Sequence, residues 1–302
     1  MPNFLIIGAA KSGTTALYHY LKQHPQIYMS PVKEPGFFAF EGERPQYFGP
    51  GDDRFSSHMV MNLKDYQGLF AAVDNQIAIG EASQAYLSLS EVSASRIQQY
   101  TPCAKLIAVL RHPAERAYSN YQMLVTTGRE YLGFTQALDE EEARMSKQWS
   151  YLWAYKMRGL YHARLQPYFD RFAREQIRIY LYEDWNTRPY EVLQDMFRFL
   201  QVDDTFIPDM TMRHNVPYPP YSQTVRAFLK NPPNTLKTFL KPFLPKVLRR
   251  KIIKKMESLN QKKTPPPPLD PEIRRQLTEV YRDDILKLQD LIGRDLSHWI
   301  QP

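Results

Sequence analysis

The N-terminal region restricts the possible architectures more than any other part of the chain. Residues 3–7, Asn-Phe-Leu-Ile-Ile, form a short apolar run typical of a strand buried in a parallel sheet. The stretch Gly8-Ala9-Ala10-Lys11-Ser12-Gly13-Thr14-Thr15 follows directly, and apolar residues then recur at helical spacing over 16–21 until His24-Pro25 ends the pattern. The order strand, glycine loop, helix predicts the opening unit of an α/β sheet.

The same order recurs further along the chain. Apolar runs at 77–80, 105–110 and 176–181 each lead into a polar or charged segment, and the second continues into a helical stretch through Met123. Strands and helices that alternate on this scale indicate a mostly parallel sheet. We therefore expect a single-domain α/β fold of the P-loop type, in which helices cover both faces of a central parallel sheet.

The composition changes after residue 230. The chain becomes rich in proline, lysine and leucine and reaches Pro265–Pro268, a run that cannot be helical. A helix is predicted over Pro271–Ile292, with an apolar stripe along one side and Gly293 at its end. These features divide the chain into an α/β core (1–230), a basic Pro/Lys-rich insertion or lid (231–268) and a C-terminal helix that packs on the core (269–302).

The glycine loop has the spacing of a phosphate-binding loop. Gly8 and Gly13 stand five residues apart, as in the motif G-x-x-x-x-G-K-[ST], and Thr15 fills the hydroxyl position. The lysine departs from the motif, because Lys11 lies inside the loop and Thr14 occupies the usual lysine position. Small residues let backbone N–H groups converge on phosphate oxygens, and the following helix N-terminus favours an anion. An ordinary strand-to-helix turn is the alternative to a phosphate held by Lys11, Ser12, Gly13, Thr14 and Thr15.

The predicted strand at 105–110 ends in a cation. Magnesium-dependent NTPases and kinases usually place an acid at the end of a neighbouring strand, where it holds the metal, whereas Arg111 follows this strand. An arginine there suits a second anionic group on the ligand, and we expect no metal. Ser119 lies two helical turns further on and is expected to meet the same oxyanion as Arg111. The alternative is that Arg111 caps the helix or pairs with Glu115.

At these residues the chain resembles the sulfotransferases that use 3′-phosphoadenosine-5′-phosphosulfate (PAPS), especially their glycan-modifying branch of the heparan sulfate type and the related bacterial branch. Lys11–Thr15 resembles the 5′-phosphosulfate loop of that family. Arg111–Ser119 resembles its 3′-phosphate motif, in which the first arginine and the serine hold the 3′-phosphate. Arg158 and Arg213 lie where the family contributes donor or acceptor contacts, with structural pairing as the alternative.

Two further segments carry the resemblance. Lys33-Glu34-Pro35-Gly36-Phe37-Phe38 is similar to the segment whose glutamate acts as the catalytic base in the glycan branch. Gly80–Leu87 resembles a segment that reads Glu-Lys-[Ser/Thr]-Pro-x-Tyr in that branch, but Ala82 replaces the lysine, so any electrostatic help must come from Lys33 or be absent. The resemblance implies that Lys33, Glu81 and Tyr86 contact the acceptor. Without it, Glu34 would be interpreted as a solvated loop acid beside Lys33.

The chemistry expected from these residues is sulfonate transfer from PAPS to a hydroxyl or amine of a glycan or glycolipid-like acceptor, with adenosine 3′,5′-bisphosphate as the by-product. Lys11 is the candidate for stabilising the leaving oxygen, and Glu34 is the candidate base. Two alternatives belong to other classes. One is a P-loop kinase that uses ATP and magnesium, and the other is a non-catalytic adaptor that binds membranes or polyanions.

The net charge of +7 is concentrated in one segment. Eleven Lys or Arg residues and one acid, Glu257, lie between 230 and 263, so the charge does not indicate nucleic-acid binding by the whole chain. Residues 245–260 have a basic amphipathic pattern suited to an anionic membrane surface, and a helix packed on the body is the alternative. Cys103 is the only cysteine, and the apolar runs are far shorter than the ~20 residues of a membrane span. We expect a cytoplasmic protein without a signal peptide, with peripheral membrane contact as a variant of that location.

Overall fold

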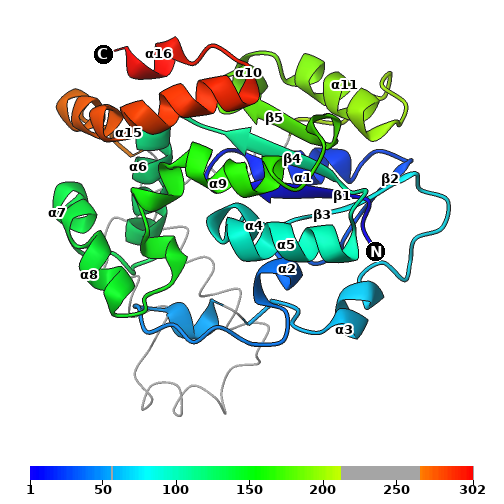
Figure 1. Ribbon diagram of the computed structural model, residues 1–302, viewed down its shortest axis with the longest axis horizontal. Coiled ribbons are helices and arrows are strands. Elements are labelled where there is room, and N and C mark those ends of the chain that lie inside the picture. The colour runs from blue at the N-terminus through cyan, green and yellow to red at the C-terminus, as the bar shows by residue number, and fades with distance from the viewer. Residues whose placement is uncertain (56, 212–265, 302) are drawn as a thin grey trace, which may run out of the picture.

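The computed structural model describes residues 1–55, 57–211 and 266–301, and these residues form a five-stranded, fully parallel sheet (Figure 1). The strand order is β2-β3-β1-β4-β5, so β1 lies at the centre between β3 and β4. The chain runs from β1 outward to β2, returns to β3 and then crosses β1 to reach β4, so the winding changes side next to β1. Open α/β sheets bind ligands at the carboxyl ends of the strands at such a point. The strands are β1 (Phe4–Gly8), β2 (Ile27–Met29), β3 (Ala78–Ala82), β4 (Lys105–Leu110) and β5 (Ile177–Leu181).

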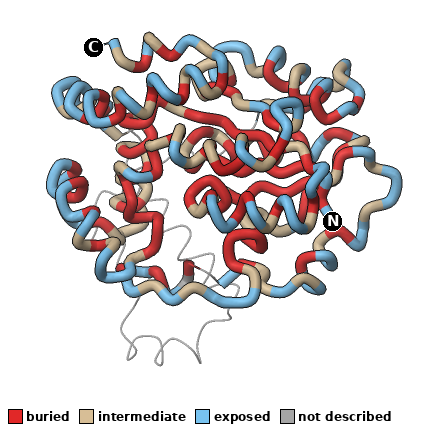
Figure 2. Tube along the Cα trace, in the orientation of Figure 1, coloured by how far each residue is buried: buried red, intermediate tan, exposed pale blue. Residues whose placement is uncertain are grey.

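Helices cover both faces of the sheet because side chains alternate along each buried strand. In β1, Phe4 and Ile6 pack into one apolar core with α1 (Thr14–Leu21) and α11 (Pro189–Leu200). Leu5 and Ile7 point to the opposite face, where α5 (Ser90–Tyr100), α9 (Tyr161–Phe169) and α15 (Pro271–Ile292) contribute to a second core. Figure 2 shows the sheet as a buried layer between helices whose outer sides are exposed.

The helices other than α1 and α11 are mostly short, apart from α5, α6, α9 and α15. Several 3₁₀ turns, at 52–54, 151–153, 157–159 and 174–176, connect them. Their bounds are α2 (Phe37–Phe40), α3 (Leu63–Gly68), α4 (Ala85–Ser88), α5 (Ser90–Tyr100), α6 (Pro113–Thr126), α7 (Phe134–Asp139), α8 (Glu141–Ser146), α9 (Tyr161–Phe169), α10 (Tyr182–Thr187), α15 (Pro271–Ile292) and α16 (Ser297–Ile300).

The predicted α/β fold is confirmed, and most predicted elements agree with the structure to within one or two residues. The strand at 105–110 and the helix Pro271–Ile292 have the predicted bounds. Strand β2 was not predicted, because three residues give no periodic signal. In the structure, the backbone N–H of Ile27 donates to the His24 carbonyl, and β2 pairs with β3. This edge strand therefore forms through its pairing with β3 and not through a pattern of its own.

The C-terminal helix α15 packs on α9 and α6 (Figure 1). Tyr281 lies so close to Gly159 that an added Cβ there would stand 2.9 Å from its ring. Beyond α15, His112 Nε2–H donates to the Trp299 carbonyl at 2.8 Å, and Trp299 Nε1–H donates to Glu183 at 2.7 Å. His112 therefore holds the C-terminal segment against the end of β4.

The proposed division at 230 and 268 remains a prediction, because most of the middle segment, including 245–260, lies outside the described residues. Among the described helices, none combines the length and apolar composition needed to cross a bilayer.

Candidate active site

The candidate residues lie at the carboxyl edge of the sheet. The glycine loop follows β1, Ser83 and Gln84 follow β3, Arg111 follows β4 and Tyr182 follows β5. Because neighbouring parallel strands end at the same edge, these segments meet there although Gly8 and Tyr182 are 174 residues apart in sequence. The architecture therefore gathers the predicted site residues around the end of β1.

The glycine loop needs small residues at two places. An added Cβ on Gly8 would stand 2.8 Å from Leu87, and one on Gly13 would stand 3.3 Å from Trp185 Nε1. Gly13 also has a φ of 85°, a left-handed conformation that glycine adopts without steric cost. Ser12 is fully buried, and its hydroxyl has no hydrogen-bond partner within the described chain. A buried hydroxyl without a partner at the start of α1 fits a loop that receives an anion.

Lys11 lies at the centre of a group of cations. Burial lowers the pKa of its ammonium to about 8, and the positive charges of Arg111, Arg158 and Arg116 lower it further in that order. The Lys11 ammonium forms no hydrogen bond or ion pair with any described residue. The structure therefore brings the predicted loop lysine and the predicted strand-end arginine into one electrostatic group.

Arg111 is held from two sides. Its guanidinium lies 5.0 Å from the centre of the Tyr182 ring, the same side chain that packs against Gly13, and its Nη2 lies 3.4 Å from Glu115 Oε2. The pairing with Glu115 that the sequence left open is thus present, together with the contact that brings Arg111 to the loop. Ser119 lies on α6 and is half-buried, so its role toward the same oxyanion remains a prediction. Arg213 lies outside the described residues.

Glu34 is fixed beside the end of β3. Its backbone N–H donates to the Ala82 carbonyl at 2.9 Å, and its carboxylate accepts from the Gln84 N–H and from Lys33 Nζ, both at 2.7 Å. The side chain is 20% exposed, so a ligand in the crevice has access to it. Phe37, which follows in the chain, stacks on Tyr66 at 4.4 Å and anchors the segment.

Beneath Glu34 lies a second, fully buried carboxylate. Glu81 accepts hydrogen bonds from the hydroxyls of Tyr86, Tyr66 (3.2 Å) and Ser83 (2.9 Å), and the Ser83 hydroxyl also accepts the Gly36 N–H at 3.1 Å. Burial raises the pKa of Glu81 to about 7, although the hydrogen bonds from Tyr86 and Ser83 act in the opposite direction. Glu81 and Tyr86 are 0% exposed here, and acceptor contact by either one remains a prediction.

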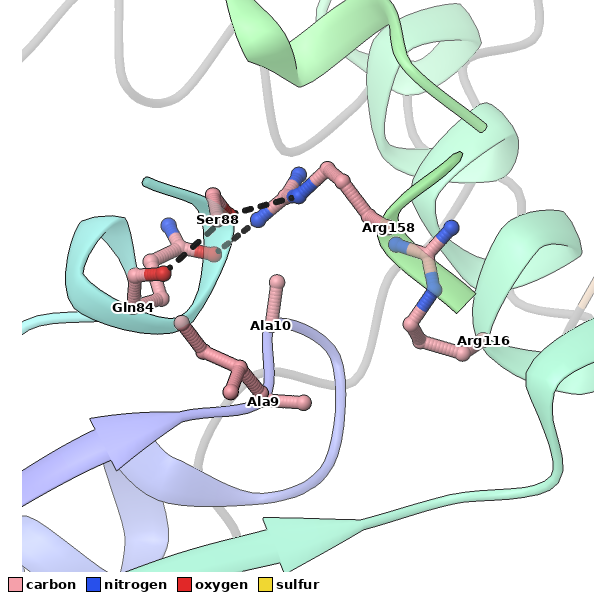
Figure 3. A pocket seen from close by; sticks show the side chains of 7 residues that line it. Ala9, Ala10, Gln84, Ser88, Arg116 and Arg158 are labelled. Carbon is pink, nitrogen blue, oxygen red and sulfur yellow. Dashed lines mark hydrogen bonds between the residues drawn. The ribbon is translucent and has the colours of Figure 1, made fainter. Parts of the chain in front are cut away.

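A small pocket lies between the loop and α4 (Figure 3). Arg158, 5% exposed, donates to Ser88 Oγ and to Gln84 Oε1, both at 3.0 Å. Arg116, 0% exposed, donates to the Tyr155 carbonyl, while its Nε and Nη1 have no partner within the described chain. The pocket is lined by Ala9, Ala10, Gln84, Leu87, Ser88, Arg116 and Arg158.

The resemblance placed Arg158 among donor or acceptor contacts, with structural pairing as the alternative, and the sequence did not single out Arg116. Arg116 belongs to the segment that resembles a 3′-phosphate motif, but its position in a helix predicts a solvent-exposed cation as readily as a buried one. Arg158 precedes a glycine and two large residues, which identify a turn and give no indication of charge burial.

The fold and site together define an α/β protein of the P-loop type that gathers four cations at the carboxyl edge of its sheet. The family model described as "Sulfotransferase family" matches residues 2–206. This chain therefore belongs to the sulfotransferase family, and the resemblance stated from its motifs is confirmed.

Known proteins similar to this chain include bacterial and eukaryotic sulfotransferases. The crystal structure of a sulfotransferase from Alicyclobacillus acidocaldarius is 32% identical, covers 100% of this chain and 99% of its own chain, and has a TM-score of 0.77. Membrane-associated sulfotransferase kil1 of Dictyostelium discoideum is 23% identical over 76% of this chain and 62% of its own length. Carbohydrate sulfotransferase 15 of Mus musculus is 28% identical over 67% of this chain and 44% of its own length. The chain thus matches less than two thirds of either curated relative.

Proposed function

We propose that this protein transfers a sulfonate group from PAPS to a hydroxyl or amine of an acceptor. The observation that carries the proposal is the convergence of Lys11, Arg111, Arg116 and Arg158 on the end of β1, with Glu34 beside them. Arg116 and Arg158 are buried, and neither forms an ion pair with a described residue, which favours a ligand with several negative charges. PAPS, with a phosphosulfate at one end and a 3′-phosphate at the other, has that character.

The donor is proposed to bind with its 5′ end in the glycine loop. The loop amides, Ser12, Thr14 and Thr15 surround the 5′-phosphate, and Lys11 reaches its oxygens. Arg111 and Ser119, with Arg213 from outside the described residues, hold the 3′-phosphate. The unpartnered hydroxyl of Ser12 and the close packing around Gly13 support this orientation, because both fit an anion approaching the backbone.

The transfer step assigns separate roles to a base and a cation. An acceptor oxygen or nitrogen attacks sulfur as the bond from sulfur to the phosphate oxygen breaks, and the acceptor proton passes to Glu34. Lys11, with a pKa of about 8, is protonated at neutral pH and stabilises the charge that develops on the leaving phosphate oxygen. The contacts of Glu34 with Gln84 and Lys33 support its role, since they fix the carboxylate before the acceptor arrives.

Neither alternative function has a specific observation in its favour. A kinase that uses ATP and magnesium is disfavoured because β4 leads into Arg111 and the family match identifies sulfotransferases. A non-catalytic adaptor has no need for a carboxylate fixed beside buried cations.

A thermal-shift experiment tests the donor assignment. We expect adenosine 3′,5′-bisphosphate to raise the melting temperature of the full chain more than ATP with magnesium does at equal concentration, since the ligand that binds the folded state more tightly stabilises it more. Preferential stabilisation by ATP with magnesium would contradict the proposal.

The acceptor is proposed to be a glycan or glycolipid-like molecule, in line with the carbohydrate sulfotransferase among the similar proteins. Mass spectrometry of an acceptor panel incubated with PAPS tests this assignment, and the expected result is the gain of one sulfonate on glycans. Sulfonation confined to non-glycan acceptors would refute it.

The location is proposed to be cytoplasmic, with peripheral contact of residues 245–260 with anionic membranes. The membrane-associated relative supports this proposal. Co-sedimentation with anionic vesicles, with and without 245–260, tests the contact, and equal sedimentation of the two proteins would reject it.

A further inference from the structure

We propose that Arg158, supported by Arg116, binds the sulfonate oxygens of the donor in the pocket between the glycine loop and α4. This inference rests on the proposed sulfotransferase function. It gives the transferred sulfonate its own binding residues, which differ from those proposed for the two phosphates.

The first argument is charge. Arg158 donates to Ser88 Oγ at 3.0 Å, Gln84 Oε1 at 3.0 Å and Asn120 Oδ1 at 3.4 Å, all of which are neutral acceptors. No carboxylate in the described part of the chain forms an ion pair with it, although it is almost completely buried. The charge of Glu34 favours the protonated form of Arg158, but the Glu34 carboxylate is bonded to Lys33 and to Gln84. A buried guanidinium without an ion-paired counter-charge is costly, and an anionic ligand that enters the pocket reduces that cost.

The second argument is the neighbouring arginine. Arg116 is completely buried, and two of its three guanidinium nitrogens have no partner within the described chain. Burial lowers the pKa of the Arg158 guanidinium, and the positive charge of Arg116 lowers it further, so the two guanidinium groups lie close enough to repel each other. Figure 3 shows the hydrogen bonds from Arg158 to Gln84 and Ser88. Arg116 forms none with the other residues drawn there. Two adjacent buried cations with donors to spare match the three oxygens of a sulfonate.

The third argument is position. Ala9 and Ala10 of the glycine loop line one side of the pocket, and Gln84 and Ser88 line another. Gln84 connects the proposed base to the arginine, because its backbone N–H donates to Glu34 while its side chain accepts from Arg158. The transferred group must lie between the attacking acceptor and the leaving oxygen. The pocket meets this requirement, because Ala9 and Ala10 of the loop line it and Gln84, which also lines it, is bonded to Glu34.

An anionic group of the acceptor has the same chemistry as a sulfonate, and the experiment separates the two sources. Dissociation constants for PAPS and for adenosine 3′,5′-bisphosphate, which lacks the sulfonate, are measured by titration calorimetry without acceptor. Wild-type protein is compared with Arg158→Gln and Arg158→Lys. Arg164→Gln is the matched control. The Arg164 guanidinium also donates to Ser88, to its backbone carbonyl at 3.2 Å, but Arg164 does not line the pocket.

We expect Arg158→Gln to weaken PAPS binding about tenfold or more relative to the bisphosphate, as for loss of a charge-assisted hydrogen bond. Arg158→Lys retains the charge and is expected to give a smaller loss, while Arg164→Gln leaves the ratio of the two constants unchanged. Equal weakening of both nucleotides would overturn the inference, because Arg158 would then hold a phosphate. Unchanged constants with a raised KM for the acceptor would overturn it in favour of an acceptor anion.

A failure of the proposed function has a different signature. Wild-type protein that binds neither nucleotide would reject the sulfotransferase proposal itself. In case Arg158→Gln does not fold, Ser88→Ala removes one of the groups that orient Arg158 and keeps the charge. We expect it to lower the affinity for PAPS and not the affinity for the bisphosphate, and an unchanged affinity for both would count against the inference.

Discussion

The two sides of the site differ in how completely their charges are paired. On the loop side, Lys11 has no partner among the described residues, Arg116 keeps two unpartnered nitrogens, and Arg158 bonds only to neutral groups. On the side of β3, Glu34 and Glu81 accept five hydrogen bonds between them from backbone and side chains. The loop side therefore carries cations that no acid pairs with in the described chain, whereas the carboxylates on the side of β3 are bonded to donors of the protein itself.

This difference implies that changes on the loop side act mainly through the donor. Changes on the carboxylate side act mainly through the chemical step or through stability. The following predictions test that separation, beginning with the largest effect.

Lys11→Ala is expected to abolish turnover and to weaken donor binding, because the variant removes the cation next to the leaving oxygen. A loss of about 10³-fold or more in kcat/KM matches the removal of one charge-stabilising group from an active site. Steady-state kinetics with PAPS measure the effect. Lys22→Ala is the control, because Lys22 is exposed. Retained turnover in Lys11→Ala would show that the loop side does not stabilise the leaving group.

Glu34→Gln is expected to lower kcat by about 10²- to 10⁴-fold and to leave the dissociation constant of adenosine 3′,5′-bisphosphate nearly unchanged. The amide keeps the size of the side chain and loses the ability to take a proton. Glu43→Gln, an exposed acid nearby in the chain, is the matched control. Wild-type turnover in Glu34→Gln would remove the proposed base.

Donor affinity is expected to fall as the pH rises through about 8. Lys11 is charged below that pKa and neutral above it, so an anionic ligand binds less tightly at higher pH, by up to about tenfold per pH unit. Calorimetric titrations of adenosine 3′,5′-bisphosphate between pH 7 and 9.5 measure this dependence. Lys11→Ala should flatten the profile, and an equally steep profile in that variant would assign the titration to another group.

Glu81→Gln is expected to change the pH dependence of stability by a few degrees in melting temperature. The pKa of Glu81 rises from 4.5 to about 7 on folding, so its contribution to stability is fully present below the unfolded pKa and is lost as the pH rises through about 7. Wild-type protein should therefore lose more stability than Glu81→Gln between pH 5 and 8. Parallel melting curves for the two proteins would show that Glu81 is ionised with its ordinary pKa.

The sequence predicted those parts of the fold and site that depend on local patterns. The glycine spacing identified the loop, and the apolar stripe with Gly293 gave the bounds of α15. The burial of Arg116 and Glu81 was not predictable, because a charged residue in a helix or at a strand end resembles an exposed one until the partners from other elements are known. The hydroxyls that surround Glu81 come from α3, from α4 and from the turn after β3, and only the fold brings these elements together.

A structure of the protein with adenosine 3′,5′-bisphosphate bound tests the central claim, which is that one nucleotide bridges the loop and the end of β4. We predict the 5′-phosphate in the loop from Gly8 to Thr15, within reach of Lys11, and the 3′-phosphate against Arg111. A nucleotide bound elsewhere, or with only one of its phosphates at this edge of the sheet, would contradict it.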